Sequence, residues 1–289
     1  MIKAAVGGVA LLAGIVVAAW FTSKPRAKDV LPSSFVEIDR GPAGGSVWQS
    51  RISTSVVPGA RPIAVYMPPG AKPGGHYPVL YALHGIPGSP YSIVVAFEFA
   101  RIADNEIAHH RCRPFIGVMP WAGRGRSFNG EWTGVWERYV LGDVVPWVDA
   151  HLPTRADPDS RAIAGFSSGG YGAVDIALRH PGVFGTVESW SGFFAPPRNG
   201  SLADADAGEL ALHDPRQLVL DEGDSLRRDG VRLYMLAASG EEGDAARAFG
   251  RQLDRFGIPN RVRVAKRGSG AKLVKAGLPA ALDYAFPPR

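Results

Sequence analysis

The chain contains a single cysteine, Cys112, in 289 residues. One thiol forms neither an intramolecular disulfide nor a CxxC redox pair, and it excludes a metal site built from several cysteines. Basic residues exceed acidic ones by five charges, yet they form no long block and no nucleic-acid-binding motif accompanies them. The composition therefore argues against redox chemistry and nucleic-acid binding, and we expect no metal and no cofactor.

Charge is also absent from residues 4–21, which are overwhelmingly apolar and are followed by Thr22-Ser23-Lys24-Pro25-Arg26. A run of about 18 apolar residues lies at the lower limit of what spans a bilayer. A cleaved signal peptide has a similar pattern, although its apolar region is usually shorter. We expect residues 1–23 to be a transmembrane anchor or a signal peptide, 24–34 a polar linker, and 35–289 one domain. The protein is then membrane-anchored or secreted, in the cell envelope.

Short β-like runs separated by turn residues follow the linker. Apolar and polar residues alternate in the runs at 35–38 and 50–57, as they do in half-exposed antiparallel strands, and a further run at 62–67 follows. Later runs are more uniformly apolar, which is typical of strands buried on both faces of a parallel sheet; they cover 78–83, 115–119, 161–165, 186–190 and 231–236. Helical patterns lie between them, most clearly at 136–151, 172–179 and 244–256. This alternation predicts a doubly wound α/β fold.

The sequence Gly165-Phe166-Ser167-Ser168-Gly169 has the form G-x-S-x-G. A predicted strand precedes it and a predicted helix follows it, which is the context of a nucleophile elbow. Such a tight turn needs small residues two before and two after the serine, and it presents the hydroxyl above the sheet. We therefore predict Ser167 as a nucleophile and the amide of Ser168 as one oxyanion donor.

The segment His84-Gly85-Ile86-Pro87-Gly88 follows another predicted strand. In a fold of this kind the loop at this place supplies the second oxyanion amide, here that of Ile86. Gly85 lets the backbone approach the substrate, and His84 orients the loop at this substrate-binding edge. Trp132 is a further substrate-binding candidate. Together with Trp121 and Trp136, it lies in a segment whose loops cover the active site in a fold of this kind. The alternative for these tryptophans is ordinary packing or a membrane-facing aromatic belt.

The chain resembles the esterase family that contains esterase D and the antigen 85-type mycolyltransferases. The resemblance covers roughly residues 45–286 and rests on four segments besides His84-Gly85; they are 139–149, 165–173, 177–184 and 189–192. It implies an α/β-hydrolase fold with a mostly parallel, eight-stranded sheet and helices on both faces. It also implies a triad in the chain order serine, acid, histidine.

The resemblance places the acid near residues 240–244, with Glu242 the first candidate and Asp244 the second. Asp244 is alternatively an acid that offsets the dipole of a helix N-terminus. The histidine should follow the strand at 261–264, but Ser269 stands near its place and no histidine follows His213. Losing one member of a triad costs on the order of 10⁴–10⁶ in turnover. His213 is a candidate substitute if its loop folds over the site.

Two functions follow from this pattern. The first is a serine esterase or acyltransferase of the cell envelope that acts on a small-molecule or lipid acyl ester. The second is a catalytically impaired relative that binds envelope lipid, glycan or protein. The expected partners are thus an ester substrate and, through the N-terminal segment, the membrane.

Overall fold

The computed structural model of the chain describes residues 27–123 and 132–288. Within these two ranges, no helix combines the length and the apolar character needed to cross a bilayer. The predicted anchor or signal segment, residues 1–23, lies outside the described residues, as does the beginning of the predicted linker.

In the described residues, nine strands form one sheet in the order β1-β2-β3-β5-β4-β6-β7-β8-β9. They are β1 (Val36–Arg40), β2 (Ser46–Ile52), β3 (Arg61–Met67), β4 (Val79–Leu83), β5 (Ile116–Pro120), β6 (Arg161–Phe166), β7 (Thr186–Trp190), β8 (Arg232–Ala238) and β9 (Asn260–Ala265). The first three pair antiparallel, β3 pairs antiparallel with β5, and the rest are parallel. The eight strands that the resemblance implies are one too few; the run predicted at 35–38 is β1, which pairs along the edge of β2.

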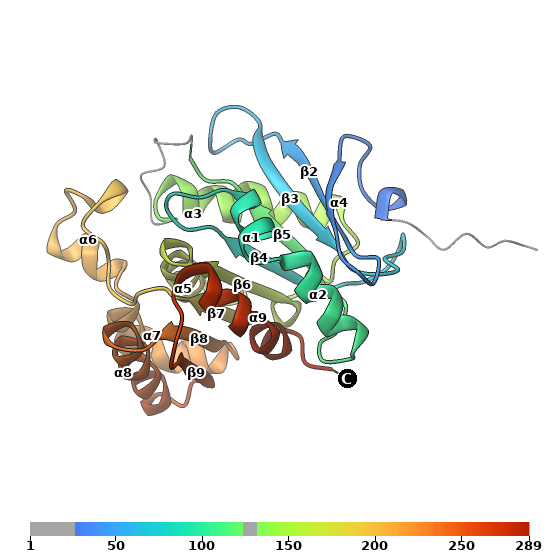
Figure 1. The fold of residues 1–289 in the computed structure, drawn as a ribbon. Helices are drawn as coiled ribbons and strands as arrows, with labels where there is room; N and C mark the ends of the chain where they lie inside the picture. Colours follow the sequence, from blue (N-terminus) through green and yellow to red (C-terminus); the bar gives the residue numbers. More distant parts are fainter. Residues whose placement is uncertain (1–26, 124–131, 289) are drawn as a thin grey trace, which may run out of the picture.

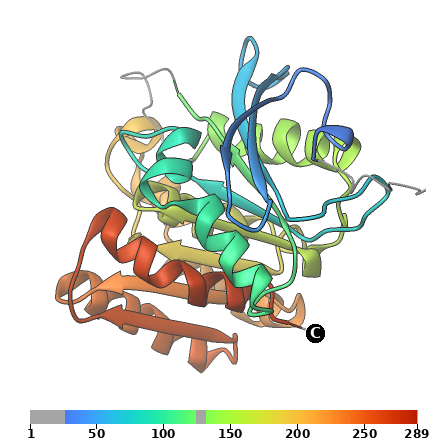
Figure 2. The same ribbon diagram turned by 45° about the vertical axis from the view of Figure 1, so that its right-hand side comes forward.

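Helices cover both faces of this sheet (Figure 1). The α-helices are α1 (Pro90–Ala96), α2 (Phe99–Ala108), α3 (Val135–Tyr139), α4 (Val145–His151), α5 (Ser168–Arg179), α6 (Ala207–Leu212), α7 (Pro215–Arg228), α8 (Glu241–Arg255) and α9 (Gly270–Ala285). The apolar core on one face joins α1, α2 and α9, and the core on the other joins α3, α4, α5, α7 and α8. Figure 2 shows α2 and α9 side by side.

Strand β4 illustrates why the apolar runs become central strands. All five of its residues are buried, and successive side chains point to opposite faces. Tyr81 and Leu83 join the core under α5, whereas Leu80 and Ala82 join the core under α9. The run predicted as one helix over 136–151 is α3 and α4 joined by a π-helical turn, Val140–Val144.

Candidate active site

Ser167 lies between the end of β6 and the first residue of α5, in a sharp turn. Its backbone has φ 55° and ψ −118°, a conformation that residues other than glycine seldom adopt. The turn is held by the Ser167 amide, which donates to the carbonyl of Trp190 at 3.0 Å, and by the Ser167 carbonyl, which accepts from Gly170 at 2.9 Å. Strain of this kind persists where the surrounding structure fixes it and is common at functional sites.

The two small residues that flank the serine are required by the packing of the turn. A Cβ atom on Gly165 would overlap the carbonyl of Gly169. A Cβ atom on Gly169 would overlap the carbonyl of Leu83, at the end of the neighbouring strand β4. The predicted tight strand-to-helix turn is therefore what the structure contains at this position.

The loop after β4 lies directly against Ser167. A Cβ atom built on Gly85 would come within 3.2 Å of the Ser167 Cβ. Ile86, the next residue along the loop, is 43% exposed. Ser168 begins α5, and the first amides of a helix have no partner within the helix. These positions fit the predicted pair of oxyanion donors, the amides of Ile86 and Ser168.

His84 is buried behind this loop and fixes its conformation. The Ala122 amide donates to His84 Nε2 at 3.3 Å, which leaves the ring proton on Nδ1. His84 Nδ1 lies 2.9 Å from the Gly85 carbonyl oxygen and donates to it. Burial lowers the pKa of His84 to about 4, from an ordinary 6.5, although the hydrogen bond to Gly85 opposes this. The imidazole is therefore neutral at physiological pH.

Trp132 packs on the far side of His84. Its indole N–H donates to the His84 carbonyl at 2.9 Å, and the two rings meet edge to face with centroids 5.1 Å apart. Trp132 is 0% exposed and His84 1% exposed. We predicted both as substrate-binding residues, but neither side chain has surface for a substrate to touch in this conformation. Their contacts are with the loop, and Gly85 alone of the three lies against the serine.

The two candidate acids differ sharply in their surroundings. One oxygen of Glu242 accepts from the amide of Ala238 at 2.9 Å and from the hydroxyl of Ser191 at 2.8 Å. Glu242 thus bridges the carboxyl ends of β7 and β8. The Asp244 side chain is 73% exposed and pairs with Arg247 one turn along α8. The geometry favours Glu242 as the acid and places Asp244 on the solvent face of the helix.

In the described residues, five of the seven histidines have hydrogen-bond partners other than Ser167. Besides His84, bonds join His109 to Asn105, His151 to Trp147, His180 to Glu137 and His213 to Asp175; His76 and His110 line a hollow next to Pro78, before β4. Among the described residues, no imidazole is bonded to the Ser167 hydroxyl. The loop that should carry the base, between β9 and α9, holds Ser269 as the residue before the helix.

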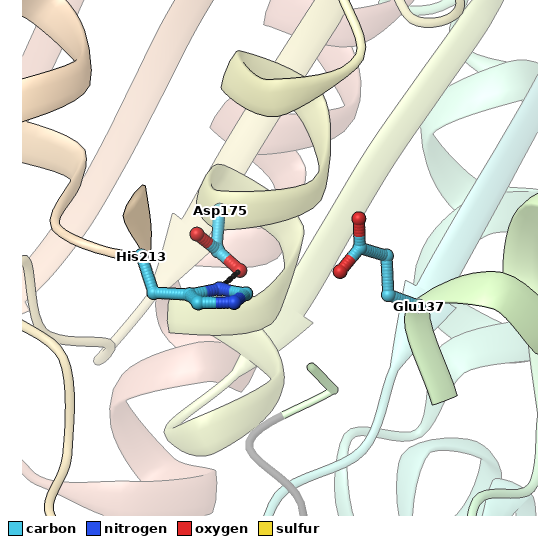
Figure 3. Close-up of side chains that lie close together, drawn as sticks. All are labelled: Glu137, Asp175 and His213. Carbon is cyan, nitrogen blue, oxygen red and sulfur yellow. Dashed lines mark hydrogen bonds and ion pairs between the residues drawn. The ribbon is translucent and has the colours of Figure 1, made fainter. Parts of the chain in front are cut away.

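His213, the candidate substitute, belongs to a buried ionic cluster with Glu137 and Asp175 (Figure 3). Its Nδ1 lies 2.9 Å from an Asp175 oxygen, and its backbone carbonyl accepts from the Tyr171 hydroxyl at 2.7 Å. Burial raises the pKa of Asp175, and His213 partly offsets this. The His213–Asp175 pair therefore links the end of α6 to the middle of α5, and not to the turn at Ser167.

Glu137, Asp175 and His213 are residue types that bind divalent cations, and their ligand atoms lie within 4.8 Å of one another. However, Arg179 occupies one Glu137 oxygen at 2.5 Å and His180 bonds to the other. Burial alone would raise the pKa of Glu137, but these two partners hold it below its ordinary value. The cluster is therefore compensated by an arginine, and it ties α3, α5 and α6 together.

The doubly wound sheet and the elbow on which Ser167 stands define an α/β-hydrolase fold. Residues 54–253 match the family described as "Putative esterase", and the chain belongs to that family. The chain is 32% identical over 161 residues to Esterase Rv1288 of Mycobacterium tuberculosis; the match covers 54% of this chain and 34% of that protein. The chain thus spans about a third of the length of that curated relative.

Solved structures share the fold. One is a ferulic acid esterase, with a TM-score of 0.74, 22% identity, and coverage of 84% of this chain and 98% of the other. Another is an S-formylglutathione hydrolase from Agrobacterium tumefaciens, with a TM-score of 0.71, 18% identity, and coverage of 86% and 98%.

Proposed function

We propose that this protein is a serine esterase or acyltransferase of the cell envelope. The observation that carries the proposal is Ser167 in a strained elbow with the Gly85 loop packed against it. Ser167 Oγ attacks the acyl carbonyl carbon, and the amides of Ile86 and Ser168 hold the developing oxyanion. The alcohol leaves with a proton, and water or a second alcohol then takes the acyl group from the serine.

The relatives support this reaction class. Membership of the esterase family, a curated relative named as an esterase and structural neighbours named as ferulic acid esterase and S-formylglutathione hydrolase all point to acyl transfer from an ester or thioester. We propose an acyl ester as the substrate and leave the acceptor as water or an alcohol.

In the proposed site Glu242 is the acid, and in the described residues no imidazole is bonded to the serine. Glu242 is held at the end of β8, where it would orient a base, whereas the loop before α9 offers Ser269. Turnover lower by about 10⁴-fold or more than that of an intact triad is expected. The low expected turnover favours a second candidate function, in which the protein binds an envelope lipid, glycan or protein and releases it unchanged.

The deciding experiment measures hydrolysis of short-chain nitrophenyl esters by the full chain, the Ser167→Ala variant and a surface control, Ser225→Ala. We expect slow hydrolysis that Ser167→Ala abolishes and Ser225→Ala leaves unchanged. Equal rates in all three would end the enzyme proposal. In that case, an envelope lipid or glycan that raises the thermal midpoint of the protein would support the binding function.

The location is part of the same proposal. The apolar sequence of residues 4–21 supports a membrane-anchored or secreted protein outside the cytoplasm. Fractionation of cells that express the full chain tests this, because an anchored protein stays with membranes after an alkaline wash, and a cleaved one appears in the medium without residues 1–23.

A further inference from the structure

The C-terminal part of the chain carries a run of positive charge without acidic residues. Between Asp254 and Asp283 the sequence has no acidic residue but seven basic ones, never more than two in a row. They are Arg255, Arg261, Arg263, Lys266, Arg267, Lys272 and Lys275. In the part of the chain that the structure describes, only Lys275 of these seven forms an ion pair, with Glu98 at 2.7 Å. The other six charges are therefore not neutralised by a carboxylate of these residues.

Four of the seven follow one another along an edge of the molecule, and we call them the basic strip. Arg261 and Arg263 lie on β9, an end strand of the sheet, and Lys266 and Arg267 follow that strand directly. All four are exposed. The valines that alternate with the arginines on β9 pack against glycines of α8. The two arginines therefore point to the opposite face, about 7 Å apart along the strand.

The ring of Tyr284, on α9, orients the first residue of the strip. The guanidinium of Arg261 lies over this ring at 5.2 Å, and that of Arg232, on β8, lies over it at 4.9 Å. Arg232 also donates to the backbone carbonyl of Tyr284 at 2.7 Å. A guanidinium that rests on a ring keeps its charge, and it loses less conformational freedom when it binds an anion.

The chemistry of the strip suits a linear polymer that carries an anionic group on each repeat. A guanidinium donates two parallel N–H groups to a phosphate or a carboxylate, and such charged pairs are stronger than neutral hydrogen bonds. The four charges are spread over residues 261–267, up to about 20 Å of chain, so a single small anion meets only one or two of them. A polymer meets all four and releases its counterions when it binds.

The position of the strip favours a polymer over a lipid surface. The short helix η1 (Ala27–Asp29), the first described element after the predicted anchor, lies on the opposite side of the molecule from β9 (Figure 1 and Figure 2). Strands β1 and β9 are the two ends of the nine-stranded sheet, up to about 38 Å apart at the usual strand spacing. A chain that leaves a membrane beside η1 therefore holds the basic strip at a distance from the lipid.

We propose that the basic strip is a binding site for a linear anionic polymer of the cell envelope, with phosphate or carboxylate groups at regular intervals. The proposal rests on the proposed location, because the location determines which polymers the strip meets. It does not require catalysis by Ser167, since β9 is three strands from β6, or about 14 Å. Charged side chains also protect an exposed sheet edge from pairing with another chain, and the experiment separates the two roles.

The experiment measures by calorimetry how tightly the full chain binds sodium polyphosphate, polygalacturonate and neutral dextran. One variant combines Arg261→Gln with Arg263→Gln, and a second combines Lys266→Gln with Arg267→Gln. The matched control removes two exposed charges elsewhere, at the end of α7, and combines Arg227→Gln with Arg228→Gln. Circular dichroism confirms that each variant is folded.

We expect polyphosphate or polygalacturonate to bind and dextran not to bind, and the tighter polymer shows which anionic group the strip prefers. Each strip variant should weaken binding by about tenfold or more, whereas the α7 control should change it by less than about twofold. The slope of log affinity against log salt concentration should fall by about two in each strip variant, because two ionic contacts are lost.

Unchanged affinity in both strip variants, or equal binding of dextran, would overturn the proposal. A strip variant that dimerises while its polymer affinity stays the same would also overturn it, because the charges would then only protect the sheet edge. Vesicles of phosphatidylglycerol and of phosphatidylcholine test the lipid alternative. A preference for phosphatidylglycerol that the strip variants lose, without polymer binding, would assign the strip to lipid instead.

The outcome is independent of the proposed function. Ser167→Ala should bind the polymers as tightly as the wild-type chain, so an inactive enzyme leaves the binding result unchanged. Cell fractionation tests the location separately. Polymer binding that depends on the basic strip, in a chain without esterase activity, would uphold this inference and defeat only the enzyme proposal.

Discussion

His84 Nδ1 donates a hydrogen bond of 2.9 Å to the carbonyl oxygen of Gly85, and this one contact sets the direction of the Ile86 amide. The Gly85 carbonyl and the Ile86 N–H belong to the same trans peptide, in which the two groups point in opposite directions. Because the carbonyl is held on the imidazole, the N–H points away from His84. His84 therefore orients the Ile86 amide of the proposed site, although its buried side chain touches no substrate.

Substitution of His84 tests this role. Asparagine can place an N–H donor near the position of Nδ1, whereas leucine cannot. We expect His84→Leu to slow acylation of Ser167 by about 10²-fold, the usual effect of losing an oxyanion donor, and His84→Asn to slow it by less than about tenfold. The measurement is the rate of labelling by a fluorophosphonate, with circular dichroism to confirm folding. Equal rates in folded His84→Leu and wild-type protein would contradict the assignment.

Ser269, which stands where the family resemblance places the histidine, leads to a gain-of-function prediction. Ser269→His returns an imidazole to the loop between β9 and α9, where Glu242 can orient it. We expect ester hydrolysis to rise by about 10²-fold or more, since an intact triad is worth far more than this. Lys272→His, one turn along α9, should give no gain.

In the Ser269→His background, the two candidate acids become distinguishable. Glu242→Gln keeps an acceptor for Ala238 and Ser191 but removes the charge, so it should cancel most of the gain. Asp244→Asn, on the exposed face of α8, should change the rate by less than about twofold. A loss that follows Asp244 instead would show that the acid is misassigned.

Packing at the elbow predicts a stability effect. A methyl group at Gly165 has no room beneath the Gly169 carbonyl, so Gly165→Ala should lower the free energy of unfolding by about 1–3 kcal/mol. Gly142→Ala is the control, because its Cβ would sit 3.5 Å from Val56, an ordinary contact. Urea denaturation followed by circular dichroism gives both values, and equal midpoints for the two variants would contradict the packing argument.

Glu188, fully buried on β7, predicts a pH dependence of stability. Burial raises the pKa of Glu188 to about 8 from an ordinary 4.5, and the hydrogen bond from Trp190 only partly opposes this. Between these values the folded chain holds a proton that the unfolded chain has released. The free energy of unfolding therefore falls as pH rises through this window and levels off above about pH 8.

The effect of Glu188 on the free energy of unfolding is measured most clearly between pH 6.5 and 8. His84, whose pKa is lowered from 6.5, makes the free energy of unfolding rise with pH, but only below pH 6.5. Urea titrations in this range should show a decline for wild type and a flat profile for Glu188→Gln. The same decline in both proteins would show that Glu188 is not its source.

Much of the fold and the tight turn at Ser167 could be predicted from the sequence, because both rest on local patterns. Uniform apolar runs mark the central strands, and Gly165 and Gly169 around Ser167 mark a turn that only small residues permit. Strand β2 was harder to place, because its partly exposed residues have mixed polarity; the run predicted at 50–57 overlaps it only at residues 50–52.

Side-chain contacts between distant segments could not be read from the sequence. Trp132 and His84 are 48 positions apart, and only the folded chain shows that the indole bonds to the backbone of His84. Similarly, nothing in the spacing of Glu242 and Ser191 indicates that they meet across two strands. The burial of Trp132 removed it from the substrate-binding candidates.

The most direct test of the account is active-site labelling mapped to a residue. Wild-type and Ser269→His proteins are treated with a fluorophosphonate, digested, and analysed by tandem mass spectrometry. We expect one phosphonylated residue, Ser167, with faster labelling in Ser269→His and none in Ser167→Ala. An adduct on another serine, or no adduct on Ser167 in either protein, would contradict the claim that the elbow presents the Ser167 hydroxyl between two amide donors.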